Sequence, residues 1–144
     1  MKTIEIEYKF TCDDKLARTF SLSIDSETLV LKNTPIPPLP DWARLDFHKC
    51  PFCQLKSETE KYCPLSVNLI DLVKGFKNLF SYDKTFVEVK MAQRVVQKHT
   101  TVQEGVSSLM GLYIATSSCP QTDFFKPMAR FHLPFSSDLR RPLV

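Results

Sequence analysis

Glycine is scarce in this chain of 144 residues, which contains only three. Gly75, Gly105 and Gly111 all lie in segments whose apolar spacing predicts helices, so no glycine remains for a loop that cradles phosphate. This excludes a P-loop and the dinucleotide-binding fingerprint. A glycine inside a helix costs about 1 kcal/mol relative to alanine, and we therefore expect another backbone to approach these helices closely.

Long apolar runs are also lacking. No run approaches the ~20 residues needed to span a bilayer. Residues 1–7 alternate polar and apolar side chains and do not form the apolar core of a signal peptide. We therefore expect no membrane partner and a cytoplasmic location. Disulfides are rare in that compartment, where grouped cysteines are more often metal ligands or redox groups.

Strong charge and catalytic signatures are missing as well. The formal net charge is +3, too small to support strong attraction to nucleic acid or to acidic membranes. The chain has three histidines and no HExxH helix, and its serine pairs lack a nucleophile elbow. The sequence thus favours a non-enzymatic role with another protein as partner, and leaves enzymatic activity open.

The residues that are present predict one α+β domain over 1–144. Residues 1–33 contain three alternating runs, 4–10, 20–24 and 29–31, with turns at 12–15 and 25–26, which predicts an antiparallel β-meander with one wet face. Residues 34–41 are rich in proline and predict a stiff extended strap. A proline-rich ligand for an SH3-type domain is the alternative.

Residues 42–135 form the cysteine-rich helical and β part. Asp41–Leu45 predicts one helical turn anchored by Trp42, and Ser66 is the expected cap of a helix that reaches Phe80. A second hairpin is expected over 86–99. The capping-box spacing at 101–104 opens another helix that ends at Ser117. We expect irregular structure with a short helical turn over 124–135, a packing or hydrogen-bonding role for His132, and a loose tail over 136–144.

Four cysteines carry the strongest chemical signal, and three of them precede proline: Cys50-Pro51-Phe52-Cys53, Cys63-Pro64 and Cys119-Pro120. Structural zinc takes four soft ligands in tetrahedral geometry, and a CxxC turn brings two sulfurs to the same side. Proline after cysteine keeps that cysteine out of helical conformation. The spacing predicts a metal knuckle with the ligands Cys50, Cys53, Cys63 and Cys119, in which zinc couples metal binding to folding.

Several alternatives remain open for these residues. The same thiolates suit an iron–sulfur cluster, and His48 is the reserve ligand if one cysteine is excluded. Cys63 and Cys119 are otherwise ordinary buried small side chains. Cys12 lies in a predicted turn and is interpreted as a free thiol.

Two resemblances bear on function. Cys50-Pro51-Phe52-Cys53 resembles the active-site motif of glutaredoxins, which implies thiol–disulfide exchange at Cys50 and Cys53. In that family the motif opens a long helix, whereas the charged residues 56–60 and Cys63-Pro64 leave no room for one here. The stretch from Trp42 through the three Cys-Pro corners to residues 130–135 resembles uncharacterised bacterial proteins with paired Cys-Pro motifs, which implies no known activity.

The sequence therefore leads to three functional hypotheses. The first is a non-enzymatic adaptor or interaction module stabilised by zinc. The second is a thiol–disulfide redox protein that uses Cys50 and Cys53. The third is a weak nucleic-acid-binding module, whose contact residues would lie on the second hairpin: Lys84, Lys90, Arg94, Lys98 and His99, interleaved with Phe86.

Overall fold

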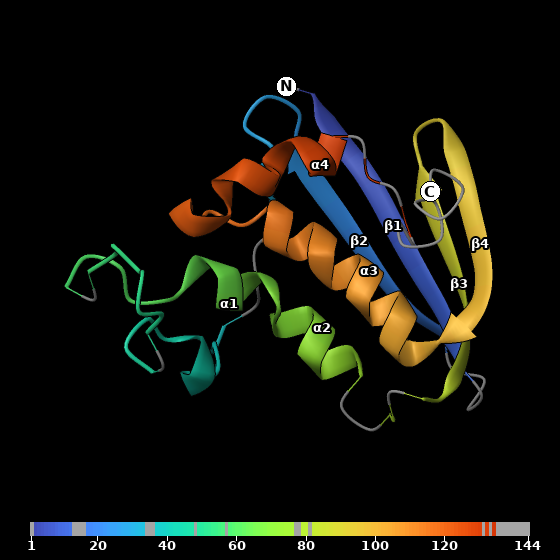
Figure 1. Ribbon diagram of the computed structural model, residues 1–144, viewed down its shortest axis with the longest axis horizontal. Coiled ribbons are helices and arrows are strands. Elements are labelled where there is room, and N and C mark those ends of the chain that lie inside the picture. The colour runs from blue at the N-terminus through green and yellow to red at the C-terminus, as the bar shows by residue number, and fades with distance from the viewer. Residues whose placement is uncertain are drawn as a thin grey trace, which may run out of the picture.

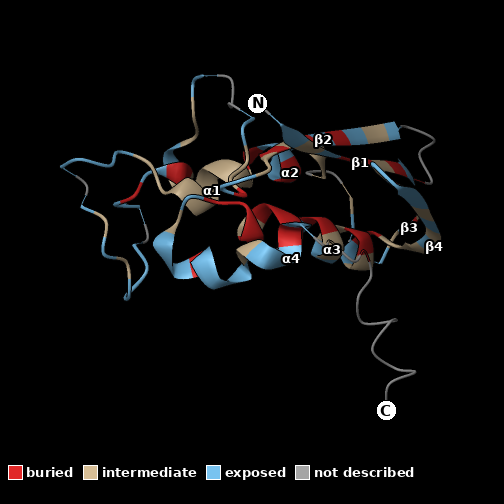
Figure 2. Ribbon diagram, turned by 90° about the horizontal axis from the view of Figure 1, so that it is seen from above, coloured by how far each residue is buried: buried red, intermediate tan, exposed pale blue. Residues whose placement is uncertain are grey.

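The protein is an α+β domain in which helices cover one face of a single antiparallel sheet (Figure 1). The computed structural model describes residues 2–12, 17–33, 37–47, 49–56, 58–76, 79–80, 82–130, 132 and 134. The strands are β1 (Thr3–Cys12), β2 (Ala17–Asp25), β3 (Lys84–Met91) and β4 (Arg94–Thr101), in the spatial order β2-β1-β3-β4. In Figure 2 the helices lie together on one side of this sheet.

Alternation along β1 decides which face of the sheet is buried. Ile6, Tyr8 and Phe10 are buried, while Glu5 and Thr11 on the opposite face are exposed. Residues directly opposite each other share a face, and Tyr8 lies opposite Phe20 on β2 and Val89 on β3. The predicted hairpin over 86–99 is confirmed as β3 and β4, with both its inward valines, Val87 and Val89, fully buried.

The third strand of the predicted meander is wrong. Leu31 makes only an isolated bridge with Ile24, and its N–H donates to the carbonyl of Thr116 instead, at 2.9 Å. The turn that precedes it is longer than expected, because Asp25 Oδ1 accepts hydrogen bonds from the N–H groups of residues 27 and 28. Leu29 then takes a left-handed φ of 59°. The chain is thereby redirected toward the helical layer.

Helix α3 (Val102–Ala115) is the main cover of the sheet. Its predicted cap is confirmed, since the Thr101 hydroxyl accepts a hydrogen bond from the N–H of Glu104 at 3.3 Å. The buried side of the helix is the following set: Val102, Gly105, Leu109, Leu112, Tyr113 and Ala115. The helix ends just before Ser117, as expected.

The single helix predicted from Ser66 to Phe80 is instead two short ones. These are α1 (Pro64–Asn68), whose N-cap is Cys63, and α2 (Ile70–Gly75). Residues 79–80 are not helical, and residues 77–78 lie outside the described part of the chain. The helix stops because Phe76 turns onto the sheet, where its ring centroid lies 4.8 Å from that of Phe10 and 5.4 Å from that of Phe20.

The remaining helices are short. They are η1 (Asp41–Ala43), η2 (Pro120–Phe125) and α4 (Lys126–Arg130), and they confirm both predicted helical turns. The anchors of the first turn are Ala43 and Leu45, which are buried, whereas Trp42 is only partly buried. Among the described residues, no helix is long and apolar enough to cross a membrane. The predicted tail over 136–144 and residues 34–36 of the strap lie outside the described ranges.

At two of the three helical glycines, the missing side chain makes room for a phenylalanine ring. The prediction that another backbone approaches these positions is wrong there. A Cβ on Gly75 would lie 2.6 Å from Phe20 Cζ, and a Cβ on Gly105 would lie 2.6 Å from Phe10 Cε2. Both distances are far below van der Waals contact. Gly111 differs, because apart from its chain neighbours and its own helix backbone, no atom in the described structure lies within 4 Å of its Cβ position.

We predict that Gly105→Ala destabilises the protein by roughly 1–3 kcal/mol, because the Phe10 ring is fully buried and has no room to move. Chemical denaturation measures this change. Gly111→Ala is the matched control, and it should leave the free energy of unfolding unchanged or raise it by up to about 1 kcal/mol. Equal losses in the two variants would contradict the close contact at Gly105.

Candidate functional site

The four candidate metal ligands lie at a turn and at two helix starts. The N–H of Cys53 donates to the carbonyl of Cys50 at 3.0 Å, which closes the expected CxxC turn. Cys63 precedes α1 and Cys119 precedes η2, and both have extended backbones (ψ of 119° and 125°) before a proline at the first helical position. The predicted effect of proline on the conformation of these two cysteines is therefore confirmed.

Backbone hydrogen bonds close the base of the loop that carries Cys50 and Cys53. The N–H of Leu45 donates to the carbonyl of Lys61 at 3.0 Å, and the N–H of Cys63 donates to the carbonyl of Ala43 at 2.8 Å. We call residues 46–62 the cysteine loop. In Figure 1 this loop projects beyond the sheet, on the side away from β4.

One side-chain hydrogen bond joins the cysteine loop to the segment that follows Cys119. Gln121 Nε2 on η2 donates to the carbonyl of Phe52, inside the CxxC turn, at 3.0 Å. All described residues of the loop are exposed or only partly buried. The loop therefore has no hydrophobic core of its own in this part of the structure.

The structure does not by itself assemble the metal site. Within the described residues, no group of three or more His, Cys, Asp or Glu side chains is placed to hold a metal ion. His48, the reserve ligand, lies outside them. Cys50 is exposed, and Cys53, Cys63 and Cys119 are partly buried free thiols. The four-cysteine site thus stays a prediction.

The fifth cysteine is separate from this region. Cys12 is a free thiol, as expected, but it is the buried last residue of β1 and not part of a turn. Its sulfur donates to the hydroxyl of Thr85 at 3.6 Å. Its side chain follows the alternation of β1 and points to the buried face, as do those of Tyr8 and Phe10.

The surroundings of the CxxC turn differ from those that the resemblance to glutaredoxins implies. Residues 51–52 form a turn, and no helix occurs among the described residues between Cys53 and Cys63. A helix start beside the first cysteine is what lowers the thiol pKa in such proteins. The described geometry does not place a helix start beside Cys50.

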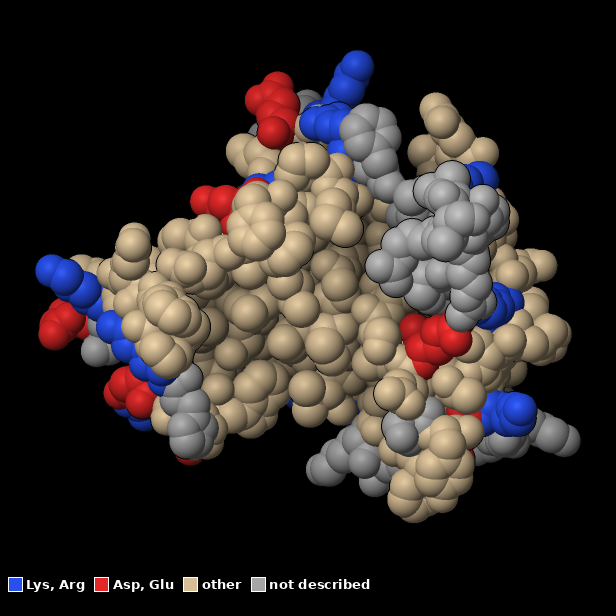
Figure 3. Space-filling view, viewed as in Figure 1, with Lys and Arg blue, Asp and Glu red and all other residues tan. Residues whose placement is uncertain are grey.

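Exposed aromatic side chains gather on the parts of the chain that the Gln121 hydrogen bond joins. Phe52 is 76% exposed in the cysteine loop and Phe124 is 74% exposed on η2. The ring of Phe125 lies 4.0 Å from that of Phe124, and Met128 on α4 is 61% exposed. Figure 3 shows a broad central face over the helical layer without Lys, Arg, Asp or Glu among its coloured residues.

Two basic residues of the second hairpin have partners within the chain. Lys98 pairs with Glu104 of α3, and Arg94 Nη2 donates to the carbonyl of His132 at 2.6 Å. Across the open face of the sheet, charges are paired in the register, with Lys9 opposite Glu88 and Lys90 opposite Glu7. Two of the basic residues proposed to contact nucleic acid thus have partners within the chain, and the nucleic-acid hypothesis stays a prediction.

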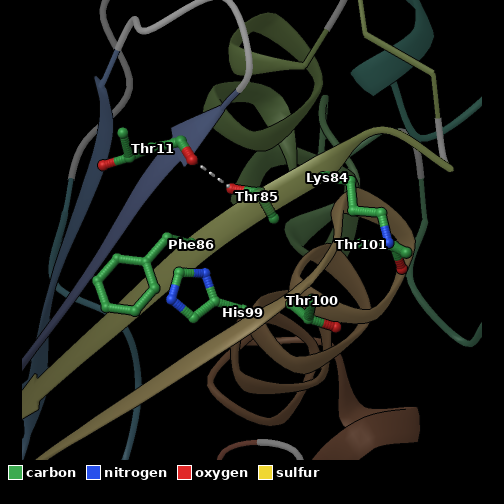
Figure 4. A pocket seen from close by; sticks show the side chains of 7 residues that line it. All are labelled: Thr11, Lys84, Thr85, Phe86, His99, Thr100 and Thr101. Atoms are coloured by element: carbon green, nitrogen blue, oxygen red, sulfur yellow. Dashed lines mark hydrogen bonds between the residues drawn. The ribbon is translucent and has the colours of Figure 1, made fainter.

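A hollow of about 330 Å³ lies at the end of this hairpin (Figure 4). Phe86 and His99 are opposite in the register and their ring centroids lie 4.5 Å apart. Figure 4 shows this pair at one end of the hollow, and Lys84 and Thr101 at the other. The polar groups do not converge on a common point, so the hollow has little of the character of a ligand site.

A partly buried polar cluster forms around Tyr8, for which the sequence indicated only core packing. The Tyr8 hydroxyl hydrogen-bonds to Ser108 Oγ at 2.7 Å and to His132 Nε2 at 2.5 Å. Burial raises the pKa of Tyr8. Burial, and then the nearby charge of Arg94, lowers the pKa of His132 to about 4. The hydrogen-bonding role predicted for His132 is confirmed. The sequence did not indicate Tyr8 as its partner, because Tyr8 is one of the alternating inward residues of β1 and resembles its apolar neighbours.

The chain matches a model of a protein family. A family model described as a domain of unknown function, DUF6901, matches residues 6–139. No curated protein and no solved structure matches the chain.

We predict that acidification weakens the fold through His132. The pKa of this ring is about 4 when folded and 6.5 in the ordinary state, so the unfolded chain binds more protons between these values. The free energy of unfolding should therefore fall as the pH drops from 6.5 to 4, by up to about 3 kcal/mol. Urea denaturation across this range measures the change.

The His132→Gln variant is the control for this experiment, because its side chain is uncharged at every pH. Its free energy of unfolding should depend less on pH over the same range, since the groups that titrate in both proteins then make the whole contribution. Parallel pH profiles for the two proteins would show that His132 is not the responsible group.

Proposed function

The chain belongs to the DUF6901 family, and from that premise we propose that it is a non-enzymatic interaction module whose cysteine region binds a protein partner and is stabilised by zinc. The observation that carries the proposal is the set of exposed aromatic side chains on the cysteine loop and η2. Phe52 and Phe124 are the two most exposed large apolar side chains in the described structure.

Exposed aromatic side chains can gain binding energy by burial against a partner. Burying one large apolar side chain contributes about 1.5–3 kcal/mol, and aromatic residues dominate the binding energy of many interfaces. Phe52 is held by the contact of its carbonyl with Gln121. Phe124 lies three residues after Gln121 on η2. This arrangement favours contact of both rings, Phe52 and Phe124, with the same partner.

The absence of buried side chains among the described residues of the cysteine loop supports the proposal of zinc. Hydrophobic packing therefore contributes little to holding the loop in place. Small regions without a core are commonly held by metal or disulfide links. Three of the proposed ligands, Cys50, Cys53 and Cys63, lie in or next to the cysteine loop. The fourth, Cys119, lies two residues before Gln121, whose side chain contacts the loop at the Phe52 carbonyl.

We predict one equivalent of zinc per chain in the purified, tag-free protein, measured by plasma mass spectrometry, with no visible absorption band. Cys50→Ser and Cys119→Ser should both lose this zinc and lower stability to a similar degree, because both residues would be ligands of one ion. Cys12→Ser is the control and should keep its zinc. Unchanged zinc in Cys119→Ser would remove that residue from the site, and a metal-free wild-type protein would remove zinc from the proposal.

We predict that the double variant Phe52→Ser, Phe124→Ser loses a protein that the wild type captures, as measured by quantitative mass spectrometry and then with the purified partner. Phe80→Ser is the matched control, because Phe80 is 63% exposed on the connection before β3, outside the cysteine loop and η2. Unaltered binding by the double variant would contradict the assignment of this surface. Substrate turnover by the purified protein would contradict the non-enzymatic role.

A further inference from the structure

A hollow distinct from that of Figure 4 lies between the edge strand β2 and the helices that cover the sheet. Its volume is about 370 Å³, which is within the range of sites for small molecules. One wall is formed by residues 18–21 of β2, and the other by Asp71, Lys74 and Gly75 of α2. Tyr113 of α3 completes the lining.

The elements that bound this hollow are fixed to one another. The ring of Phe20 on β2 fills the space that a side chain at Gly75 would need. Arg18 Nε donates to the carbonyl of Gly75 at 2.7 Å, which fastens the end of α2 to the same strand. Asn68 Nδ2 donates to the carbonyl of Tyr113 at 3.0 Å and joins α1 to α3. The shape of the hollow is therefore set by the packing around it.

The hydroxyl of Tyr113 distinguishes this hollow from the one at the end of the second hairpin. Tyr113 is only 4% exposed, yet its hydroxyl makes no hydrogen bond to any described residue. Buried tyrosine hydroxyls usually have a partner, as that of Tyr8 does. Burial, and then the negative charge of Asp71, raises the pKa of Tyr113. The hydroxyl therefore keeps its proton and lies within electrostatic reach of the Asp71 carboxylate.

Two side chains of opposite charge line the same wall of the hollow. Asp71 and Lys74 are three residues apart on α2, a spacing that places Cβ atoms about 5–6 Å from each other. In the part of the chain that the structure describes, no ion pair joins them. Both are exposed, so the wall offers a negative and a positive group side by side.

We propose that this hollow binds a small zwitterion with an ammonium group beside a carboxylate, which is the chemistry of a free amino acid. The ammonium group donates hydrogen bonds to the Asp71 carboxylate and to the Tyr113 oxygen, and the carboxylate pairs with Lys74. A simple cation would lie next to the like charge of Lys74, and a simple anion next to that of Asp71. The site lies on other elements than the cysteine region and does not rest on the proposed function.

The experiment is saturation-transfer difference NMR on the full chain with the twenty free amino acids, each added separately and then titrated. We expect at least one of them to bind. The amine that lacks its carboxylate, and the acid that lacks its ammonium group, should each bind about 10-fold more weakly or worse, because each loses a charged contact. Binding by none of the twenty would overturn the proposal, and so would equal binding by the amine or the acid.

Two variants place the bound amino acid in this hollow. Tyr113→Phe and Asp71→Asn should each weaken its binding by about 10-fold or more, because each removes a hydrogen bond to a charged group. Tyr82→Phe is the matched control, since Tyr82 is 71% exposed on the connection before β3, away from the hollow. Binding that both variants retain in full would overturn the assignment.

A stability measurement without ligand tests the state of the Tyr113 hydroxyl itself. Tyr113→Phe should unfold at the same urea concentration as the wild type or at a higher one, because the missing hydroxyl has no partner among the described residues. Tyr8→Phe should unfold at a lower concentration, because its hydroxyl bonds Ser108 and His132. An equal loss in both variants would show that the Tyr113 hydroxyl already has a partner, which would overturn the proposal.

Discussion

The distance between α3 and the sheet is set by one contact, the ring of Phe10 against the bare backbone of Gly105. Phe10 is fully buried and touches Phe20 and Phe76 at ring-centroid distances of 5.9 and 4.8 Å. A Cβ at position 105 would lie 2.6 Å from Phe10 Cε2 and 3.1 Å from Val87 Cγ2, so a side chain there would push the helix away from the sheet. Because Ser108 lies one turn further on, the same spacing brings its hydroxyl to Tyr8 and completes the partly buried polar cluster.

The chain combines two kinds of region that are stabilised differently. The sheet, α2 and α3 share a dense apolar core, in which side chains from β1, β2 and β3 interlock with the helices. The cysteine loop is attached to this body by backbone hydrogen bonds at its base and by Gln121 near its CxxC turn. The loop is therefore held mainly by hydrogen bonds, whereas the sheet and its helices are held by apolar packing.

Local patterns in the sequence predicted local structure well. The alternation in β1 and the capping box at Thr101 depend on neighbouring residues only, and both are confirmed. Long-range contacts were not predictable in this way. The break after Gly75 depends on Phe76 meeting Phe10, and the lost third strand depends on Leu31 meeting Thr116. For the candidate site, the sequence predicted the turn and corner geometry of the cysteines, but not the Tyr8–His132 contact, since nothing in an alternating strand marks one aromatic residue as hydrogen-bonded.

The side-chain amide of Asn33 occupies the edge of β2. Its Oδ1 accepts a hydrogen bond from the N–H of Ser23 at 2.9 Å, and its Nδ2 donates to the carbonyl of Ser21 at 2.8 Å. The N–H of Lys32 donates to the carbonyl of Ser23 at 2.7 Å. These are the groups that an incoming strand would need. The Asn33 amide and the Lys32 N–H therefore occupy groups of Ser21 and Ser23 that a further strand would need, which disfavours edge-to-edge pairing at this part of β2.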